Sequence, residues 1–509
     1  MAKIRGVVIS MKIGTIQAIT VAAVIGASAL SLQAQTRVQA PMPFLHPLFS
    51  DHAVLQRDAD VPVWGWANPD SEVTVEFAGQ TVKATAGKDG KWMATLAPMG
   101  YSTESRTMKV SGTANNLTQV VEAKDILVGD VWLCSGQSNM EMGIKNCNAQ
   151  QDIDSANFPN LRLLSVPKSV QYQPQYTAKM YWAHCTPQSL SSMGDWGGYS
   201  AAAFYFGREL HTTLNVPIGL IHSSWGGTLA EAWTSPEGLK PLKDFDERIA
   251  GAEAAIKANP GNPHVCGALY NGMICPILPY RIMGAIWYQG CSNANRAFQY
   301  RALLSAMIND WRKSFKVGEF PFIIVQLAAF RPTNPEPRES DWAEIRESQA
   351  YVAKTVPNCG LAVTIDIGDA GDIHPKNKAD VGRRLAYWAL ANTYGRPETP
   401  YSGPVYKSMK IVDGSIRLDF DYTCGGLVAK GNDGKLTGFA IAGEDKKFVW
   451  ATATIQDGTI LVYSPDVPNP VAVRYAWDIN PVCNLYNGVG LPAVPFRTDD
   501  WPMITKDNK

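Results

Sequence analysis

The spacing of apolar and polar residues changes along the 509-residue chain and divides it into regions. From 43 to 125, short runs alternate apolar with polar residues, as in EVTVEF at 72–77, and turn sequences such as KDGK at 88–91 separate the runs. Alternation with a period of two is typical of strands with one buried face, and KDGK is typical of a hairpin turn. We therefore predict a small β-sandwich domain over residues 43–125.

Between 126 and 399, continuous apolar runs alternate with stretches of helical periodicity. Apolar runs rich in β-branched and aromatic residues indicate buried strands. Strands that alternate with helices indicate a parallel sheet with helices on both faces. We predict an α/β domain over 126–399, with strands at 126–134, 216–224, 281–290, 320–330 and 360–369 and helices at 200–214, about 300–315, 341–355 and 377–394.

The last hundred residues return to short strand-like runs. Gly and Asp turns separate these runs, as expected for antiparallel strands. We predict a C-terminal β-rich domain over 400–509, with strands within 416–422, 436–443, 447–455 and 459–465.

The N-terminus has the features of a targeting segment. Three basic residues precede an uncharged, mostly apolar stretch at 13–32, which ends in SLQAQ. This order predicts a signal peptide over 1–34, cleaved near Ala34, and export to the periplasm or the extracellular space. The stretch is also long enough for a membrane anchor, but its many small residues make it weakly hydrophobic. We therefore favour cleavage, with no stable membrane insertion afterwards.

The charge balance and the cysteines narrow the possible functions. Lys and Arg together number 46, as do Asp and Glu, so no broad electrostatic field would attract nucleic acid. Nine cysteines are scattered with neither a disulfide framework nor a zinc-like spacing. We predict no nucleic-acid partner, no metal and no cofactor.

Unusual loops follow the five predicted strands of the α/β domain. In parallel sheets the ligand lies beyond the carboxyl ends of the strands, so loops that follow these strands converge on one site. The loops are SGQSNM at 135–140, SSWGGT at 223–228, YQGCSNA at 288–294, RPTNPEPRES at 331–340 and DAGDIHP at 369–375.

Ser138 and His374 are the candidate nucleophile and base. Ser138 follows a strand at a tight glycine-containing turn, although many serines at such turns only cap a helix. His374 shares a loop with Asp372, and an imidazole and a carboxylate delivered together resemble half of a Ser-His-Asp triad. A loop residue at a helix start is the alternative for His374. His222 is a rival base, but it lies in an apolar strand and is better explained as a core histidine.

Candidate donors for an oxyanion come from two other loops. Gly226 and Gly227 give the backbone the freedom to turn N–H groups toward a ligand, and Gln289 offers a side-chain amide. The backbone N–H of Ser138 would complete the set. For each glycine there is an alternative explanation, which is that the turn itself sterically requires a glycine.

Several motifs together resemble the sialate O-acetylesterases of the SGNH/GDSL hydrolase superfamily. They are LFSDHAVLQRDADVPVWGWANP, GDVWLCSGQSNMEM, LIHSSWGGTLAEAW, YNGMICPILPYRIMGAIWYQGCSNA and DIGDAGDIHPKNKADVGRRLA, in order between about 44 and 394. The resemblance implies a flavodoxin-like catalytic domain joined to β-sandwich modules. It also implies hydrolysis of O-acetyl esters on sugars through a serine acyl-enzyme, with Ser138 as nucleophile, His374 as base, and Gly226 and Gly227 in the oxyanion hole.

Two positions depart from the family pattern. Many SGNH enzymes have Asp three residues before the histidine, where this chain has Gly371, so either Asp372 or a backbone carbonyl is expected to orient His374. Cys291 stands where the family commonly has Glu, whose carboxylate is expected to hold neighbouring loops. The second departure leaves open a carbohydrate-binding homologue with impaired catalysis.

The expected partners are an O-acetylated sugar and water. Trp225 is a candidate for stacking on a sugar ring, and Arg331 or Arg338 for pairing with the carboxylate of sialic acid. Acetyl-xylan or another acetylated polysaccharide is the alternative substrate.

Overall fold

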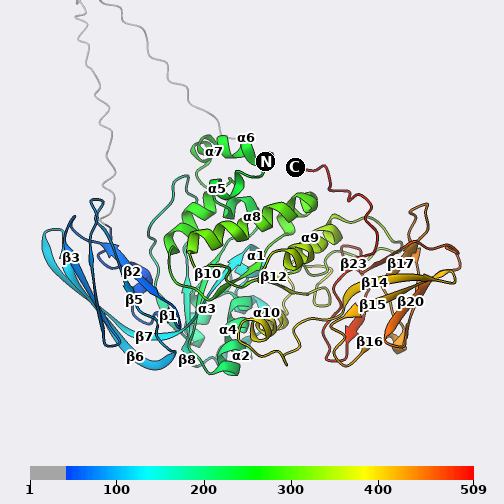
Figure 1. Cartoon of the computed structure of the whole chain (residues 1–509), viewed down its shortest axis with the longest axis horizontal. Coiled ribbons are helices and arrows are strands. Elements are labelled where there is room, and N and C mark those ends of the chain that lie inside the picture. Colours follow the sequence, from blue (N-terminus) through cyan, green and yellow to red (C-terminus); the bar gives the residue numbers. More distant parts are fainter. Residues whose placement is uncertain (1–41) are drawn as a thin grey trace, which may run out of the picture. The chain divides into compact units, whose positions relative to one another are not determined.

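A computed structural model describes residues 42–509 of the chain (Figure 1). The predicted signal segment lies outside the described residues. None of the helices within 42–509 has the length and apolarity that crossing a bilayer requires.

The N-terminal part is built mainly from antiparallel strands, as the alternating pattern predicts, while β1 pairs in parallel with β7. Val73, Val75 and Phe77 face inward and are at most 2% exposed, and the buried Trp64 and Trp92 belong to the same hydrophobic core. β3, β4 and β6 join β7 in one sheet, while β2 and β5 form a separate pair. The strands are β1 (Val54–Gln56), β2 (Val61–Trp66), β3 (Glu72–Phe77), β4 (Gln80–Thr85), β5 (Lys91–Leu96) and β6 (Ser102–Ala114).

One long strand joins this part to the central sheet. β7 runs from Leu117 to Gly136 without a break, so the boundary predicted at residue 125 falls inside a strand. Its first half pairs with β6 and its second half lies between β10 and β11. The loop that carries Ser138 therefore follows a strand that pairs with both parts of the described chain.

The central sheet confirms the predicted α/β class. Its strands run in the order β13-β12-β11-β7-β10-β8-β9, and all neighbours are parallel except β8 and β9. Every residue of β10 and β11 is buried, as expected of strands covered on both faces. The strands are β8 (Phe158–Ser165), β9 (Trp182–Cys185), β10 (Ile218–Ser224), β11 (Gly284–Tyr288), β12 (Phe322–Val325) and β13 (Cys359–Ala362).

Helices cover both faces of this sheet (Figure 1). On one face Trp132 of β7 packs edge-on against Phe206 of α4, and α10 lies beside α4. On the other face Trp287 of β11 packs against Trp311 of α8, and α9 lies beside α8. The helices are α1 (Ser138–Glu141), α2 (Gln150–Asp154), α3 (Pro187–Ser192), α4 (Ala201–Leu214), α5 (Pro236–Leu239), α6 (Asp246–Ala250), α7 (Ala252–Ala258), α8 (Ala297–Phe315), α9 (Asp341–Thr355) and α10 (Lys378–Asn392).

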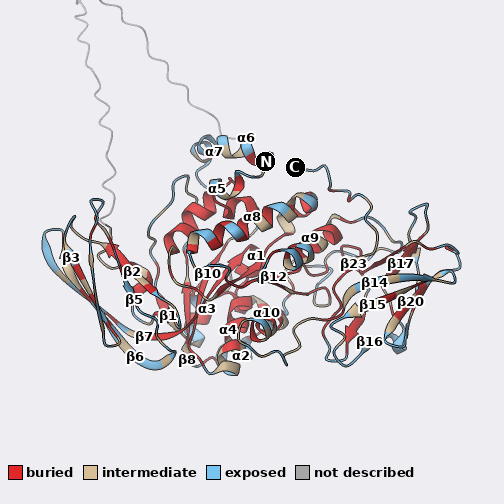
Figure 2. Cartoon of the chain, in the orientation of Figure 1, coloured by how far each residue is buried: buried red, intermediate tan, exposed pale blue. Residues whose placement is uncertain are grey.

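The C-terminal part contains two four-stranded sheets and one strand pair, in the orders β14-β15-β20-β19, β18-β17-β21-β23 and β16-β22. Apolar residues of both larger sheets form a second core, which includes Leu418, Val462, Ile441 and Val473 (Figure 2). The strands are β14 (Val405–Val412), β15 (Ser415–Asp421), β16 (Leu427–Ala429), β17 (Phe439–Ala442), β18 (Val449–Trp450), β19 (Thr452–Gln456), β20 (Thr459–Tyr463), β21 (Ala472–Tyr475), β22 (Leu485–Asn487) and β23 (Phe496–Arg497).

Candidate active site

The carboxyl ends of three neighbouring strands bring the candidate loops together. Gly136 at the end of β7 is in register with Ser224 of β10 and with Tyr288 of β11. Gly136 has φ +145°, and a Cβ there would lie 2.3 Å from the carbonyl oxygen of Tyr288. Only glycine allows this approach, so the turn that precedes Ser138 requires the glycine that the sequence provides.

Ser138, His374 and Asp372 form a hydrogen-bonded row. Ser138 Oγ lies 2.9 Å from His374 Nε2, and His374 Nδ1 lies 3.2 Å from Asp372 Oδ1. The same carboxylate oxygen accepts the backbone N–H of His374 at 2.9 Å. The group at Nδ1 is thus the Asp372 side chain, in the geometry of a nucleophile, its base and an orienting carboxylate.

The surroundings of His374 favour a neutral imidazole. Burial lowers the pKa of His374; the Asp372 carboxylate opposes this effect and the positive charge of Lys378 adds to it. The half-buried Trp196 packs edge-on against the imidazole, with ring centroids 4.8 Å apart. A neutral imidazole that Asp372 orients can accept a proton at Nε2.

Gly226 lies against the nucleophile, but a carboxylate accepts its N–H. A Cβ built on Gly226 would lie 3.3 Å from the Cβ of Ser138. The Gly226 N–H donates to Glu141, whose other carboxylate oxygen accepts Lys168 Nζ at 2.6 Å. Sequence reasoning missed Glu141, although its position one helical turn after Ser138 places it on the same side of α1. Glu141 holds the loop after β10 against α1.

The backbone N–H groups of Ser138 and Gly227 make no hydrogen bond in the part of the chain that the structure describes. Within residues 42–509, no acceptor lies within hydrogen-bond reach of either backbone N–H. Gly227 is exposed and has φ +77°, the left-handed conformation that favours glycine. Of the two glycines expected to supply an oxyanion donor, Gly227 has the available N–H in this structure.

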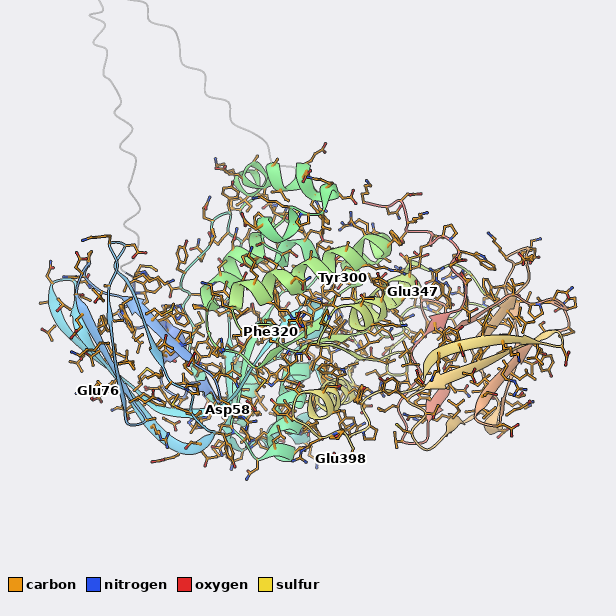
Figure 3. The ribbon with its side chains drawn as sticks, viewed as in Figure 1. Asp58, Glu76, Tyr300, Phe320, Glu347 and Glu398 are labelled. Atoms are coloured by element: carbon orange, nitrogen blue, oxygen red, sulfur yellow. The ribbon has the colours of Figure 1, made fainter. Side chains whose placement is uncertain are left out.

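In this structure the side-chain amide of Gln289 is not free to donate to an oxyanion. It is fully buried and donates its side-chain amide to the carbonyl of Thr228 at 3.1 Å and to Asn293 Oδ1 at 2.7 Å. Tyr300, which Figure 3 labels, donates its hydroxyl to Gln289 Oε1 at 2.8 Å. With both amide hydrogens used inside the protein, Gln289 ties two loops together and has none left for an oxyanion.

Cys291 lies beside the site as a protonated thiol. Burial raises the pKa of Cys291 to about 12, although the positive charges of Lys378 and Arg346 oppose this effect. A thiol that keeps its proton at neutral pH is a poor nucleophile.

The candidate substrate residues are spread over two regions. Trp225 is half-buried, and Lys168 Nζ lies 5.4 Å from its ring centroid. Arg338 lies 3.4 Å from Asp478, and Arg331 lies over the ring of its neighbour Phe330. Neither arginine contacts the side chains of Ser138, His374 or Asp372 in this structure.

A cavity of about 310 Å³ adjoins α1, the short helix that begins at Ser138. Glu141, Lys168, Asp195 and His222 contribute to its wall. Lys168 is balanced by Glu141 at 2.6 Å and by Asp195 at 3.4 Å. Burial lowers the pKa of His222 to about 4, which fits the core histidine that the sequence indicates.

One group of potential metal ligands lies away from this site. His52, Asp125 and His184 place their ligand atoms within 4.8 Å of one another. Sequence spacing could not indicate this group, because the three residues come from distant segments. Asp125 Oδ2 lies 2.7 Å from His52 Nδ1, 3.0 Å from His184 Nε2 and 2.8 Å from Arg162 Nη1. These are hydrogen-bond distances, and Arg162 already neutralises the carboxylate, so a hydrogen-bonded cluster explains the group.

Comparisons with known proteins agree on one family. The model for "Carbohydrate esterase, sialic acid-specific acetylesterase" matches residues 128–391. The sialate O-acetylesterase of Mus musculus is 32% identical over 88% of this chain and 92% of its own, and that of Homo sapiens is 31% identical over 87% and 90%. The crystal structure of a carbohydrate acetylesterase from Xanthomonas citri superposes with a TM-score of 0.80 at 38% identity, covering 90% of this chain and 99% of that one. The chain therefore belongs to the sialic acid-specific acetylesterase family of carbohydrate esterases.

Proposed function

We propose that this protein removes O-acetyl groups from sialic acids through an acetyl-serine intermediate. One observation carries the proposal, namely the 2.9 Å contact between Ser138 Oγ and His374 Nε2 with the Asp372 carboxylate behind the imidazole. Membership of a family of carbohydrate esterases supports the same chemistry. The serine is therefore best understood as a nucleophile.

The first half of the reaction forms the acetyl-enzyme. Ser138 Oγ attacks the acetyl carbonyl carbon while His374 Nε2 takes the hydroxyl proton. The backbone N–H groups of Ser138 and Gly227 are the proposed donors to the oxyanion, since neither has an acceptor within residues 42–509. His374 then returns the proton to the departing sugar oxygen as the C–O ester bond breaks.

The second half releases acetate. Water attacks the acetyl carbon and gives a proton to His374, and the tetrahedral intermediate forms again in the same oxyanion hole. Its collapse breaks the bond to Ser138 Oγ, which recovers the proton from His374. The net reaction consumes one water and yields the sugar alcohol and acetic acid.

We further propose an SGNH-type, flavodoxin-like catalytic domain with β-sandwich modules on either side. The strand order β10-β7-β11-β12-β13 supports this, because in chain order it is the 2-1-3-4-5 arrangement of flavodoxin-like sheets. The β8–β9 pair is then an addition at one edge. The core shared by the two four-stranded C-terminal sheets supports a sandwich there.

An acetylated neutral polysaccharide such as acetyl-xylan is the second candidate substrate. The observation that favours it is the charge balance of the cavity beside α1, where Glu141 and Asp195 already neutralise Lys168. A sialate carboxylate would find no unpaired cation in this cavity, whereas a neutral sugar needs none.

We also propose export, on the basis of the basic and apolar segment in residues 1–34. N-terminal sequencing of the protein recovered from the producing cell tests this proposal. A mature chain that begins near residue 35 supports it, and a chain that retains the segment contradicts cleavage.

Acetate release tests the activity and separates the substrates. The wild type is expected to release acetate from 9-O-acetyl sialic acid, and Ser138→Ala is expected to release none. Acetyl-xylan serves as the competing substrate, and a higher kcat/KM on it selects the second candidate. A wild type that is inactive on both, or a fully active Ser138→Ala variant, refutes the proposal.

A further inference from the structure

Two side chains outside the triad connect the nucleophile turn to the base loop. Asn139 follows Ser138 and donates its amide to the carbonyl of Ile373 at 3.0 Å. Lys378 Nζ donates to Asn139 Oδ1 at 2.6 Å and to the carbonyl of Pro375 at 2.7 Å. The network therefore holds the backbone on both sides of His374 and ties it to the residue after Ser138.

The position of Lys378 is unfavourable for a positively charged side chain. Its side chain is fully buried at the first residue of α10, where the helix dipole disfavours a positive charge. Within residues 42–509, no carboxylate oxygen lies within 4.0 Å of Nζ. Burial lowers the pKa of Lys378 to about 7. An unpaired buried cation destabilises the fold, so its presence beside the triad indicates a functional benefit.

The groups that face Lys378 come from four other segments. Cys147, Cys291 and Asp372 interact electrostatically with its charge, and the ring centroid of Tyr288 lies 5.5 Å from Nζ. Burial raises the pKa of Cys147 to about 11 and that of Cys291 to about 12, so both thiols are neutral at neutral pH. Asp372 is the carboxylate among them, and it is also the partner of His374.

The charge on Lys378 acts on the catalytic base. Burial is the main reason that the pKa of His374 is lowered, and the positive charge of Lys378 lowers it further, against the effect of Asp372. His374 takes up a proton below its ordinary pKa of 6.5, and Lys378, with a pKa of about 7, is mostly protonated there. The positive charge is thus present in the pH range where it keeps His374 unprotonated.

We propose that Lys378 is a positioning residue that acts with Asn139 to hold Ser138 and His374 at their reacting distance, and that its positive charge extends activity to lower pH. This inference rests on the proposed esterase function. It gives a supporting role in catalysis to a cation that contacts neither the substrate nor the reacting atoms. A neutral amine would keep two N–H donors for Asn139 and Pro375 but would lose the electrostatic effect on His374.

The test replaces Lys378 by Met, which has a similar length and no charge. The pH profile of kcat/KM is measured on an O-acetylated sugar. In Lys378→Met its acidic limb is expected to move to higher pH, because the positive charge that lowers the pKa of His374 is gone. At the plateau, kcat is expected to fall by about tenfold or more with little change in KM, because the base is less well positioned. Lys376→Met is the matched control, since Lys376 is exposed two residues away and should leave profile and rate unchanged.

A direct titration separates this inference from the proposed function. NMR of protein with labelled histidines, with His374→Ala to identify the signal, measures the pKa of His374 without any substrate. A higher His374 pKa in Lys378→Met than in the wild type supports the inference even if no substrate is turned over. A folded Lys378→Met variant with an unshifted His374 pKa and an unchanged plateau rate overturns it, while an active wild type leaves the esterase function standing.

Lys378→Arg covers the case in which the Met variant does not fold. It keeps the charge but cannot reproduce the contacts of the smaller ammonium group. The inference predicts a reduced plateau rate with the acidic limb at its wild-type pH. An unchanged rate, or a limb displaced to higher pH, contradicts it.

Discussion

Single residues set the chemistry proposed for this site, and Asp372 is more exposed than His374, the residue that it is proposed to orient. Its side chain is 46% exposed, whereas that of His374 is 23% exposed. Solvent screens an exposed carboxylate, so its main contribution is to hold the correct imidazole tautomer. Asp372 also accepts the His374 backbone N–H, which fixes the loop itself.

Replacing Asp372 by Asn tests this orienting role. The expected loss in kcat is about 10- to 1,000-fold, because an amide can present an N–H to Nδ1 and favour the wrong tautomer. The measurement is steady-state kinetics on an O-acetylated sugar. Asp369→Asn is a matched control in the same loop and should stay near the wild-type rate. If Asp372→Asn keeps the full rate, a different group orients His374.

Position 291 lies close to two fully buried cations, Lys378 and Arg346. A carboxylate there would give both cations a partner that the thiol does not provide. We expect Cys291→Glu to melt at a higher temperature than Cys291→Gln, which has nearly the same size and no charge. Thermal unfolding of the two variants at pH 7 checks this. Equal melting temperatures would show that position 291 does not compensate these charges.

At the scale of secondary structure, the length of the apolar runs decided what the sequence could predict. The buried strands β7, β10, β11 and β12 were predicted because each carries a long apolar run. The strands β8 and β9 were missed, since FPNLRLLS mixes polar residues into the run and WAHC is too short. The strand predicted at 360–369 ends at Ala362, because the following residues form the loop that leads to His374.

Contacts between distant segments explain what the sequence could not provide at the site. Ser138, His374 and Asp372 were predicted as site residues because each follows a predicted strand of the central sheet. The bond between Asn139 and Lys378 spans 239 residues, and no local pattern indicates it. Gln289 was assigned to the oxyanion from its type and loop, but only packing shows that its amide is already used.

Glu141 links α1 to the loop after β10, and its loss tests the importance of that link. Glu141→Gln keeps one acceptor oxygen but loses the ion pair with Lys168, so the loop with Gly227 should become less well ordered. We expect kcat to fall by about 10- to 100-fold with KM nearly unchanged, because the oxyanion donors stabilise the transition state. Asp154→Asn, an exposed carboxylate on α2, is the control. A change confined to KM would assign Glu141 to substrate binding.

On the scale of the whole molecule, the buried Lys378 beside the proposed catalytic site affects the stability of the fold. Lys378 lies in the interior with a pKa of about 7, well below that of an unfolded lysine. Between pH 7 and about 10.4 the unfolded chain therefore binds more protons at this residue than the native protein does. The free energy of unfolding consequently rises with pH in this range through Lys378.

Chemical denaturation at several pH values measures this contribution. The free energy of unfolding of the wild type is expected to rise between pH 7 and 9 relative to that of Lys378→Met, which has no group to titrate at this position. The difference between the two proteins removes the effect of all other titrating groups. A difference that stays constant across this range would show that the lysine is not perturbed in the native state.

The central claim is that Ser138 carries the acetyl group during turnover. The most direct measurement is peptide mass spectrometry of enzyme quenched with acid while it hydrolyses an O-acetylated sugar. We predict one acetyl group on the peptide that contains Ser138, and none at that position in Ser138→Ala. Acetyl on another residue such as Cys291, or hydrolysis that continues in Ser138→Ala, would contradict the account.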